Sequence, residues 1–528
     1  MRFCLSLYLL VAGFYLLTAS GRIGLSDSVA MFRVSESLID EHSISSDPCD
    51  PDVYNRPTGQ ACGCVPGNGG KHYAAYGLVP SFLVVPVILA ARFASHALHV
   101  NPLVASKTGV SLFTVLIAPL VCVVLANWIM KLGYSRRTAI ACACVFGFAS
   151  PFWNDAVIGF LSEPYFTLAL VTAAWILSSP RYGFACALGG LAFGVACAVR
   201  MNGAILLPSF ILFLVFNARA LRLSKWGLLS DVFQFCASFS VCMLLIALAN
   251  YARFGSPFKT GYHLVFPSIS KLLSTPVFQG LSGILFSGEV GLLIFAPWIL
   301  IGIISFPRFA RAHVPESILC ATSISIYVLF FAKYTAWHGG SVAGPRLVLP
   351  VLPMFVMIMT PAIEDICQSR DLKERHLSVV RMLLLVFVGT AFVIQVLGAI
   401  FPVERYYALM EYYKGRPTKP WWYGSIPLAS ADFLSRARLP AGQLLHSIEL
   451  DPRTADQEGT IALSAADSAI TEDHFLSLFP NPVNKMSPNL IWVKFGTLGL
   501  PFGVGAAYVL SALAIGIFGA AGVWRASP

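Results

Sequence analysis

The sequence predicts an all-α polytopic membrane protein with about 12 transmembrane helices. Hydrophobic residues make up 57% of the 528 residues and charged residues only 12%, whereas about a quarter of a typical soluble domain is charged. Apolar runs long enough to cross a bilayer recur along most of the chain. The net charge of +10 is therefore interpreted as cytoplasmic loop charge, and no nucleic-acid partner is predicted.

The predicted spans follow from these apolar runs. They cover residues 3–20, 108–130, 138–152, 157–178, 183–199, 203–217, 229–251, 281–305, 315–333, 345–362, 378–401 and 497–522. The run 78–91 is shorter, contains two prolines and ends at Arg92. It is predicted to be re-entrant or interfacial rather than spanning.

Lys and Arg gather on every second connection between the spans, which predicts that those connections are cytoplasmic. The other connections are predicted to be extracytoplasmic: 21–107, 153–156, 200–202, 252–280, 334–344 and 402–496. The chain then divides into a transmembrane region 1–401, an extracytoplasmic segment 402–496, and a last helix with a short tail, 497–528. A multi-pass protein of the plasma or inner membrane is predicted.

Three cysteines differ from the rest because they lie in a polar loop. Cys49, Cys62 and Cys64 are surrounded by Pro, Gly and Asp, while most of the others lie in apolar segments and act as small hydrophobic residues. If the loop is extracytoplasmic, one disulfide among the three is predicted.

The first outer loop begins with a predicted amphipathic helix, Ser28–Asp40, with Met31 and Phe32 on its apolar side. Such a helix is expected in the membrane interface, with its apolar side in lipid or protein. Asp27 precedes it, where a carboxylate can take a proton from an incoming hydroxyl. The alternative is that Asp27 only caps the helix N-terminus.

Basic side chains occur at the predicted outer ends of several spans. Arg200, Arg253, Lys259 and Arg346 form the pool from which ligands of a lipid-linked phosphate are predicted. Glycines in 339–344 allow backbone N–H groups to approach a ligand, and Arg346 opens the following helix, where the dipole favours an anion. Snorkelling to headgroups is the alternative for Arg200.

Four further residues in or beside these outer connections are candidates for substrate binding: Glu163, His263, Trp337 and His338. Trp337 could stack on a sugar, although the interfacial aromatic belt is the commoner place for a lone Trp. Asp155 is the rival carboxylate to Asp27, with a turn role as its alternative. The sequence holds neither a phosphate-loop motif nor a zinc-binding His-Glu-x-x-His helix, and no metal ligand is predicted.

Six short motifs occur in order between about Gly24 and Pro350. They are Ser26-Asp27-Ser28; Tyr73-Ala74-Ala75-Tyr76-Gly77-Leu78; Leu161-Ser162-Glu163-Pro164; Ala198-Val199-Arg200; Arg253-Phe254-Gly255-Ser256-Pro257 with Thr260-Gly261-Tyr262; and Trp337-His338-Gly339-Gly340 with Gly344-Pro345-Arg346. In this order they resemble the GT-C superfamily of polytopic glycosyltransferases, which includes protein O-mannosyltransferases and lipid A aminoarabinose transferases. Segment 402–496 shows no such match.

The resemblance implies a polyprenyl-phosphate-linked sugar as donor, catalysis at the extracytoplasmic face by residues within 1–401, and Asp27 as general base. Two departures leave a divalent metal an open option: Asp27 is followed by Ser28 where many relatives carry paired acids, and Glu289 lies in an unexpected place. The predicted function is transfer of a mannose-like or related hexosyl or pentosyl group to a lipid, glycan or protein.

Two other classes of protein remain as alternatives. A secondary transporter would usually carry paired repeats and ionisable groups near the bilayer midplane. Here these groups, apart from Glu163 and Glu289, gather at the outer ends of the spans, and no repeat is visible. A non-catalytic membrane scaffold is the third reading.

Overall fold

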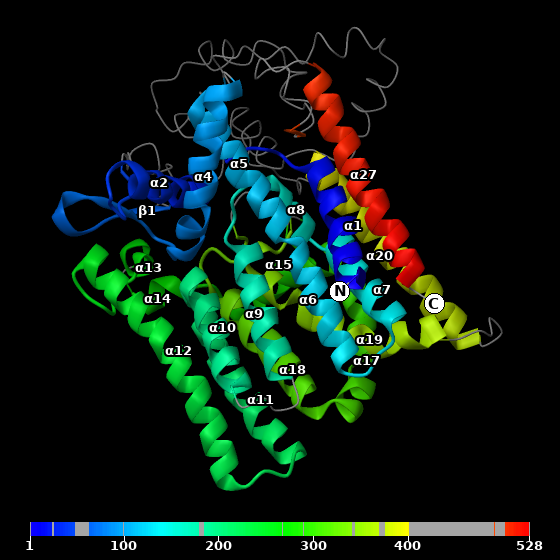
Figure 1. The fold of residues 1–528 in the computed structure, drawn as a ribbon. Helices are drawn as coiled ribbons and strands as arrows, with labels where there is room; N and C mark the ends of the chain where they lie inside the picture. Colours follow the sequence, from blue (N-terminus) through cyan, green and yellow to red (C-terminus); the bar gives the residue numbers. More distant parts are fainter. Residues whose placement is uncertain are drawn as a thin grey trace.

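The structure, a computed structural model, is helical almost throughout, as predicted (Figure 1). It describes residues 2–23, 26–47, 63–98, 100–178, 184–266, 268–288, 290–339, 344–368, 375–400, 490–491 and 502–526. The predicted segment 402–496 lies outside this part of the chain, apart from Leu490 and Ile491.

The helices of the first half are α1 (Arg2–Thr18), α2 (Ser26–Asp40), α4 (Val79–Leu98), α5 (Pro102–Ile117), α6 (Pro119–Lys131), α7 (Arg136–Phe148), α8 (Phe152–Ile158), α9 (Glu163–Leu177), α10 (Ala185–Val199) and α11 (Leu207–Ala220). Those of the second half are α12 (Lys225–Phe254), α13 (Gly261–Val265), α14 (Ile269–Leu272), α15 (Val277–Phe286), α16 (Leu292–Phe295), α17 (Ile299–Ala312), α18 (Val314–Lys333), α19 (Leu352–Gln368), α20 (Arg375–Ile400) and α27 (Phe502–Ala526). Shorter elements are the 3-10 helices η1 (Asn68–Gly70), η2 (Met201–Leu206) and η3 (Arg346–Val351), and the strands β1 (Cys64–Pro66) and β2 (His72–Ala74).

The chain is a multi-pass integral membrane protein. Among the described residues, eight helices are long and apolar enough to cross a membrane, or nine if the bent pair α7 and α8 forms one span. Three more apolar helices, α1, α9 and α10, have 17, 15 and 15 residues. The predicted number of about 12 is therefore not reached by this criterion.

The prediction of a short segment ending at Arg92 is wrong. Helix α4 has 20 residues, includes Pro86, and continues past Arg92 to Leu98, so it is one of the eight long apolar helices. Arg92 is accommodated because it forms two hydrogen bonds with Asp40 of α2, of 2.6 and 2.8 Å. A basic residue that finds a partner does not end a helix.

Two predicted spans are interrupted. The predicted span 281–305 is divided into α15, α16 and α17, with Gly288 and Pro297 in the two breaks. Glycine weakens a helix and proline removes a donor, so an apolar run that contains both does not form one helix. The predicted span 157–178 begins later, at Glu163, after a break at Gly159.

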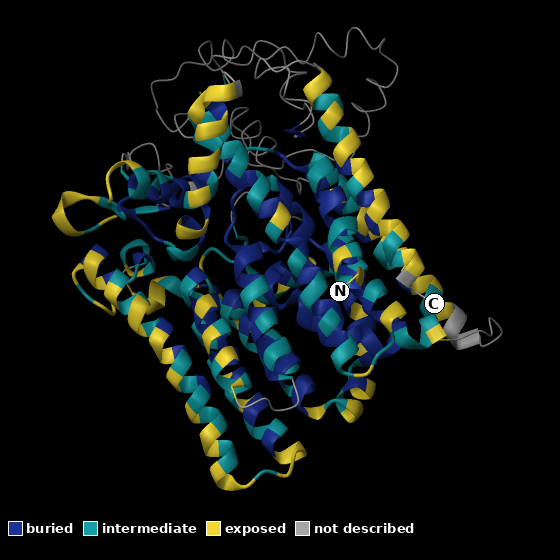
Figure 2. Ribbon diagram, viewed as in Figure 1, coloured by how far each residue is buried: buried dark blue, intermediate teal, exposed yellow. Residues whose placement is uncertain are grey.

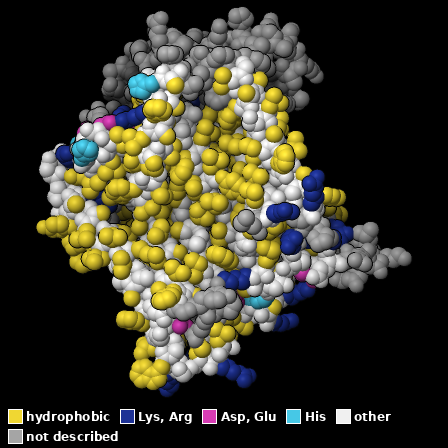
Figure 3. All heavy atoms as spheres, in the orientation of Figure 1, with side chains coloured by type: hydrophobic (Ala, Val, Ile, Leu, Met, Phe, Trp, Pro, Cys, Tyr) yellow, Lys and Arg dark blue, Asp and Glu magenta, His cyan; other side chains and the backbone are white. Residues whose placement is uncertain are grey.

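Buried residues concentrate in the middle of the bundle, where α8 and α9 lie, whereas α4, α12 and α27 are exposed along much of their length (Figure 2). Large apolar side chains such as Phe233 and Leu245 of α12 are exposed. On the face shown in Figure 3, hydrophobic side chains cover the middle, and Lys and Arg lie mainly near the edges. This pattern suits a belt of lipid around the helices.

One end of the bundle, the upper left in Figure 1, gathers α2, the hairpin of β1 and β2, and α13. The predicted amphipathic helix is confirmed as α2, two residues longer at its start than expected. Its apolar residues Met31, Phe32 and Val34 are buried in protein. The hairpin is antiparallel and pairs Val65 with Tyr73.

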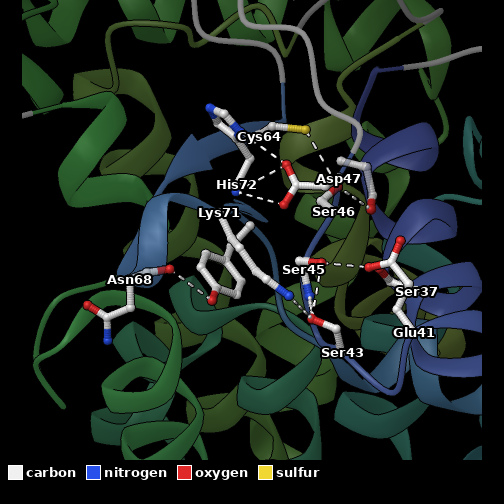
Figure 4. A network of polar contacts seen from close by, with 12 residues as sticks. Ser37, Glu41, Ser43, Ser45, Ser46, Asp47, Cys64, Asn68, Lys71 and His72 are labelled. Carbon is white, nitrogen blue, oxygen red and sulfur yellow. Dashed lines mark hydrogen bonds and ion pairs between the residues drawn. The ribbon is translucent and has the colours of Figure 1, made fainter.

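Hydrogen bonds join this end together (Figure 4). Both carboxylate oxygens of Asp47 accept from the backbone N–H of His72, and the Asn68 side chain donates to the carbonyls of Tyr251 and Ala252 in α12. Cys64 is disulfide-bonded, in agreement with an oxidised loop, while Cys49 and Cys62 lie outside the described residues.

Candidate active site

Four charged residues far apart in the sequence meet where helices begin or end. Asp27 lies in the first turn of α2, Glu163 opens α9, Arg200 follows α10, and Arg346 opens η3. All four were singled out from the sequence as site candidates. We call this set the charge cluster.

The two arginines of the charge cluster share one carboxylate. Arg200 Nη1 donates to Glu163 Oε1 at 2.5 Å, and Arg346 Nε donates to the same oxygen. Arg346 Nη2 also donates to Glu163 Oε2 at 3.4 Å and to Asp27 Oδ2 at 2.8 Å. Arg346 therefore connects Glu163 to Asp27.

Burial makes these contacts strong and their loss costly. The Glu163 side chain is 0% exposed, and those of Arg200 and Arg346 are 6% and 7% exposed. Asp27 is the most open member, at 19%. Burial alone would lower the pKa of Arg200, but the Glu163 carboxylate raises it well above its usual value, so Arg200 stays cationic.

Two tyrosines from the same end of the bundle complete the surroundings of Asp27. The Tyr76 hydroxyl donates to Asp27 Oδ1 at 2.6 Å, and its ring lies edge-on to Tyr262, 6.1 Å between centroids. Tyr262 also lies within electrostatic range of Arg200. Burial, and then the Asp27 charge, raise the pKa of Tyr76 well above its usual value. Tyr76 is thus a lasting hydrogen-bond donor.

A small pocket opens beside these residues. Tyr76, Arg200, Arg253 and Tyr262 line it, together with the ends of α10 and α12. The Nε–H of Arg200 is buried and, among the described residues, has no hydrogen-bond partner. A buried donor without a partner is unfavourable. A ligand oxygen that accepted a hydrogen bond from this N–H would therefore be stabilised.

Asp155, noted in the sequence as the rival carboxylate, is fully buried in α8. Within the described part of the chain, neither of its carboxyl oxygens has a hydrogen-bond partner. It lies within electrostatic range of Glu163, Arg346 and Arg200. The residue is therefore a neighbour of the charge cluster rather than a surface turn residue.

The remaining basic candidates are not members of the charge cluster. Arg253 is buried, but it donates to backbone carbonyls and to Asn250. Lys259 is exposed, and the exposed His263 caps the short helix α13 through Thr260. The structure does not bring Lys259 or His263 into the charge cluster.

The aromatic candidate Trp337 is half-buried and packs on α15. A Cβ atom added at Gly283 would lie 2.3 Å from its ring, which shows how closely the two approach. The ring of His338 lies beside it, 6.0 Å between centroids. Both follow α18 in the connection that leads towards Arg346.

The fit of a divalent metal can be tested on the carboxylates present. Among the described residues, no three His, Cys, Asp or Glu side chains lie together in a way that could hold a metal ion. Both oxygens of Glu163 and one of Asp27 already accept from arginines. The negative charges of these carboxylates are therefore neutralised by arginines, and the charge cluster does not fit a metal ion.

Sequence reasoning gave no role to Tyr76 and Tyr262, although each lies in one of the quoted motifs. The sequence feature that the two share is a tyrosine next to a glycine, in a loop that also carries a candidate site residue. Such a signal is common, and only the fold shows that the Tyr76 hydroxyl points towards Asp27 and that Tyr262 lies near Arg200.

Three solved chains are similar to this chain in structure. The oligosaccharyltransferase of Archaeoglobus fulgidus in the apo form is 11% identical, with 79% of this chain and 58% of that chain covered and a TM-score of 0.49. The same enzyme tethered with an acceptor peptide is also 11% identical, with 78% of this chain and 57% of that chain covered and a TM-score of 0.49. ArnT from Cupriavidus metallidurans bound to undecaprenyl phosphate is 11% identical, with 99% of this chain and 77% of that chain covered and a TM-score of 0.43.

These likenesses concern the fold. The chain spans less than two thirds of the length of the archaeal oligosaccharyltransferase. No protein-family model and no curated protein matches the sequence.

Proposed function

We propose that the protein is a membrane glycosyltransferase that moves a sugar from a polyprenyl phosphate to a hydroxyl acceptor, with Asp27 as general base. The observation that carries this proposal is the position of Asp27. It is the most exposed acid of a buried, arginine-rich cluster, and Tyr76, which binds it, also lines the adjoining pocket. The proposed base thus lies directly behind Tyr76, a residue of the pocket wall that Arg200 also lines.

In the proposed reaction the acceptor oxygen attacks the anomeric carbon as the bond from that carbon to the lipid phosphate breaks. The hydroxyl proton passes to Asp27, and the bonding electrons leave with the phosphate. Arg200, whose buried Nε–H faces no protein acceptor among the described residues, stabilises the charge that develops there. Arg346 and Tyr76 hold Asp27 in place.

The proposed donor and acceptor sites lie on the extracytoplasmic side. The segments predicted to be outside share one end of the bundle: residue 27 meets residue 346, and residue 163 meets residue 200. Trp337 and His338 remain proposed sugar contacts, and Lys259 and His263 remain proposed contacts at the rim of the site.

The test is transfer of label from undecaprenyl-phosphate-linked mannose or aminoarabinose by the full-length protein in lipid nanodiscs. Wild type should transfer label to a membrane acceptor or hydrolyse the donor, and Asp27→Asn should lower the rate by about 10²–10⁴-fold. Glu36→Gln, on the same helix but paired with Arg33, is the matched control and should be near normal. Full activity in Asp27→Asn would remove Asp27 as the base. Counterflow of solute without sugar transfer would favour a transporter.

A further inference from the structure

We propose that Tyr76 and Arg253 act as a positioning pair for Asp27, with Arg253 fixing the backbone that carries Tyr76. The proposal rests on the function proposed above, in which Asp27 is the base. It gives Arg253 a role different from binding phosphate.

The guanidinium of Arg253 donates hydrogen bonds to acceptors of the protein itself. Its Nη1 donates to the carbonyls of Ala74 and Tyr76, both at 3.0 Å. Its Nη2 donates to Asn250 Oδ1 at 2.9 Å, and its Nε to the Ala249 carbonyl at 3.4 Å. The residue is 5% exposed. A guanidinium has five N–H donors in a rigid plane. Four of them are used here: two hold the guanidinium to its own helix α12, and two bind the carbonyls at and just after the end of β2.

Close packing holds the same segment from two other sides. A Cβ atom added at Gly261 would lie 2.3 Å from Ala75 Cα, and one added at Gly77 would lie 2.0 Å from the Ala198 carbonyl oxygen. The hairpin before it is held by contacts of Asp47 with His72 (Figure 4). The backbone on either side of Tyr76 therefore has little freedom to move.

Tyr76 transmits this fixed position to Asp27. Its hydroxyl binds Oδ1 while Arg346 binds Oδ2, so both carboxylate oxygens have a partner. Tyr262 of α13 and Tyr334 after α18 also interact electrostatically with Asp27. Because Tyr76 remains protonated, its hydrogen bond favours the ionised form of the carboxylate.

The experiment measures the pH dependence of sugar transfer or donor hydrolysis, with undecaprenyl-phosphate mannose as the probe. Loss of the Tyr76 hydroxyl disfavours ionised Asp27. In Tyr76→Phe the acidic limb of the kcat profile should therefore move up by about one pH unit. The rate should approach that of wild type at high pH. A merely structural role would lower the rate equally at every pH.

Tyr73→Phe is the matched control. It removes a hydroxyl from the same hairpin, but one that donates to the Asn68 carbonyl and not to Asp27. Its pH profile should be that of wild type. An unmoved acidic limb in Tyr76→Phe, or an equal shift in Tyr73→Phe, would overturn the proposal.

Arg253→Lys tests the other member of the pair. A lysine is a compact point charge and cannot reproduce the planar contacts, so kcat should fall with KM nearly unchanged, and the acidic limb should move in the same direction. When Arg253→Lys is combined with Tyr76→Phe, kcat should fall little further than in the single variants, because both residues act through Asp27. A large rise in KM alone would instead indicate direct donor binding by Arg253.

Failure of this inference is distinguishable from failure of the proposed function. If Asp27→Asn is inactive and Tyr76→Phe has an unchanged profile, only the positioning role is wrong. If no tested donor is turned over, the ionisation of Asp27 can be followed by NMR on ¹³C-aspartate protein, with Asp27→Asn for assignment. The titration midpoint should still rise in Tyr76→Phe, and an equal midpoint would contradict the inference.

Discussion

At the scale of single residues, the charges in the cluster balance without Asp155. Arg200 and Arg346 are matched by Asp27 and Glu163, and hydrogen bonds join all four. Asp155 is a third acid, buried nearby, with neither oxygen hydrogen-bonded among the described residues. An additional buried negative charge would be unfavourable, so the balance indicates that Asp155 is protonated.

This balance predicts opposite outcomes for two isosteric substitutions. Glu163→Gln leaves two buried arginines with a single carboxylate, so the protein should lose about 3–5 kcal/mol of stability, or fail to accumulate. Asp155→Asn replaces a neutral acid by a neutral amide and breaks no hydrogen bond of the carboxyl group among the described residues, so the unfolding temperature should change little. Thermal unfolding of the two variants in the same detergent is the measurement. Comparable destabilisation by both would mean that Asp155 is ionised.

Arg346→Lys should reduce activity strongly. Arg346 makes contacts through Nε and Nη2 to two different carboxylates, and one ammonium group cannot reproduce this geometry. Donor turnover should fall while the protein still folds, because a positive charge remains. Normal turnover in this variant would mean that only the positive charge at position 346 is needed, and not the geometry of the guanidinium.

The cluster was partly predictable because three of its members, Asp27, Arg200 and Arg346, are ionisable groups at predicted span ends, where charge is unusual. Glu163 was a candidate through the motif Leu161-Ser162-Glu163-Pro164. Burial and direction are not visible in the sequence. Lys259 looked equivalent to Arg200, yet it is exposed. The roles of Tyr76 and Asp155 depend on partners far away in the chain.

At the scale of helices, the interface of α1 and α27 shows how small residues allow close approach. A Cβ atom at Gly13 would lie 2.5 Å from the Cα and N atoms of Gly516, whereas one at Gly516 would lie 3.7 Å from Gly13 Cα. Tyr508 of α27 also donates to the Leu16 carbonyl. The first and last described helices therefore pack backbone to backbone.

The two glycines predict an asymmetry. Gly13→Ala forces an atom against backbone that cannot turn away, so it should destabilise the protein by about 1–3 kcal/mol. Gly516→Ala meets only ordinary contact distances and is the matched control. Thermal unfolding in detergent should separate the two variants. Equal behaviour would mean that α27 does not pack on α1 in this register.

Helices with one continuous apolar pattern were predictable from the sequence, and α12, α18 and α20 lie close to the predicted spans. Elements with breaks were not. The predicted span 281–305 contains Gly288 and Pro297, whose effects depend on packing partners, and α4 continues past Arg92 because Asp40 of α2 pairs with it. Periodicity reports the face of a helix but not its tertiary neighbours.

At the scale of the whole molecule, the connections predicted to be outside share one end of the bundle. The Lys and Arg pattern of the loops predicts that this end is extracytoplasmic. The two ends of α12 offer a test, since this helix has 30 residues and thus spans about 45 Å. Phe258 follows its site end and Trp226 begins the opposite end, and they are 85% and 80% exposed.

We expect Phe258→Cys to react with a membrane-impermeant thiol reagent in intact cells, and Trp226→Cys to react only after permeabilisation. Accessible native thiols are first blocked, and each variant serves as the control for the other. The physical reason is the cost of moving basic loops across the membrane, which keeps Arg222 and Lys225 beside Trp226 in the cytoplasm. The reverse labelling pattern would place Asp27 and its pocket on the cytoplasmic side, and the lipid-linked donor would then have to be presented there.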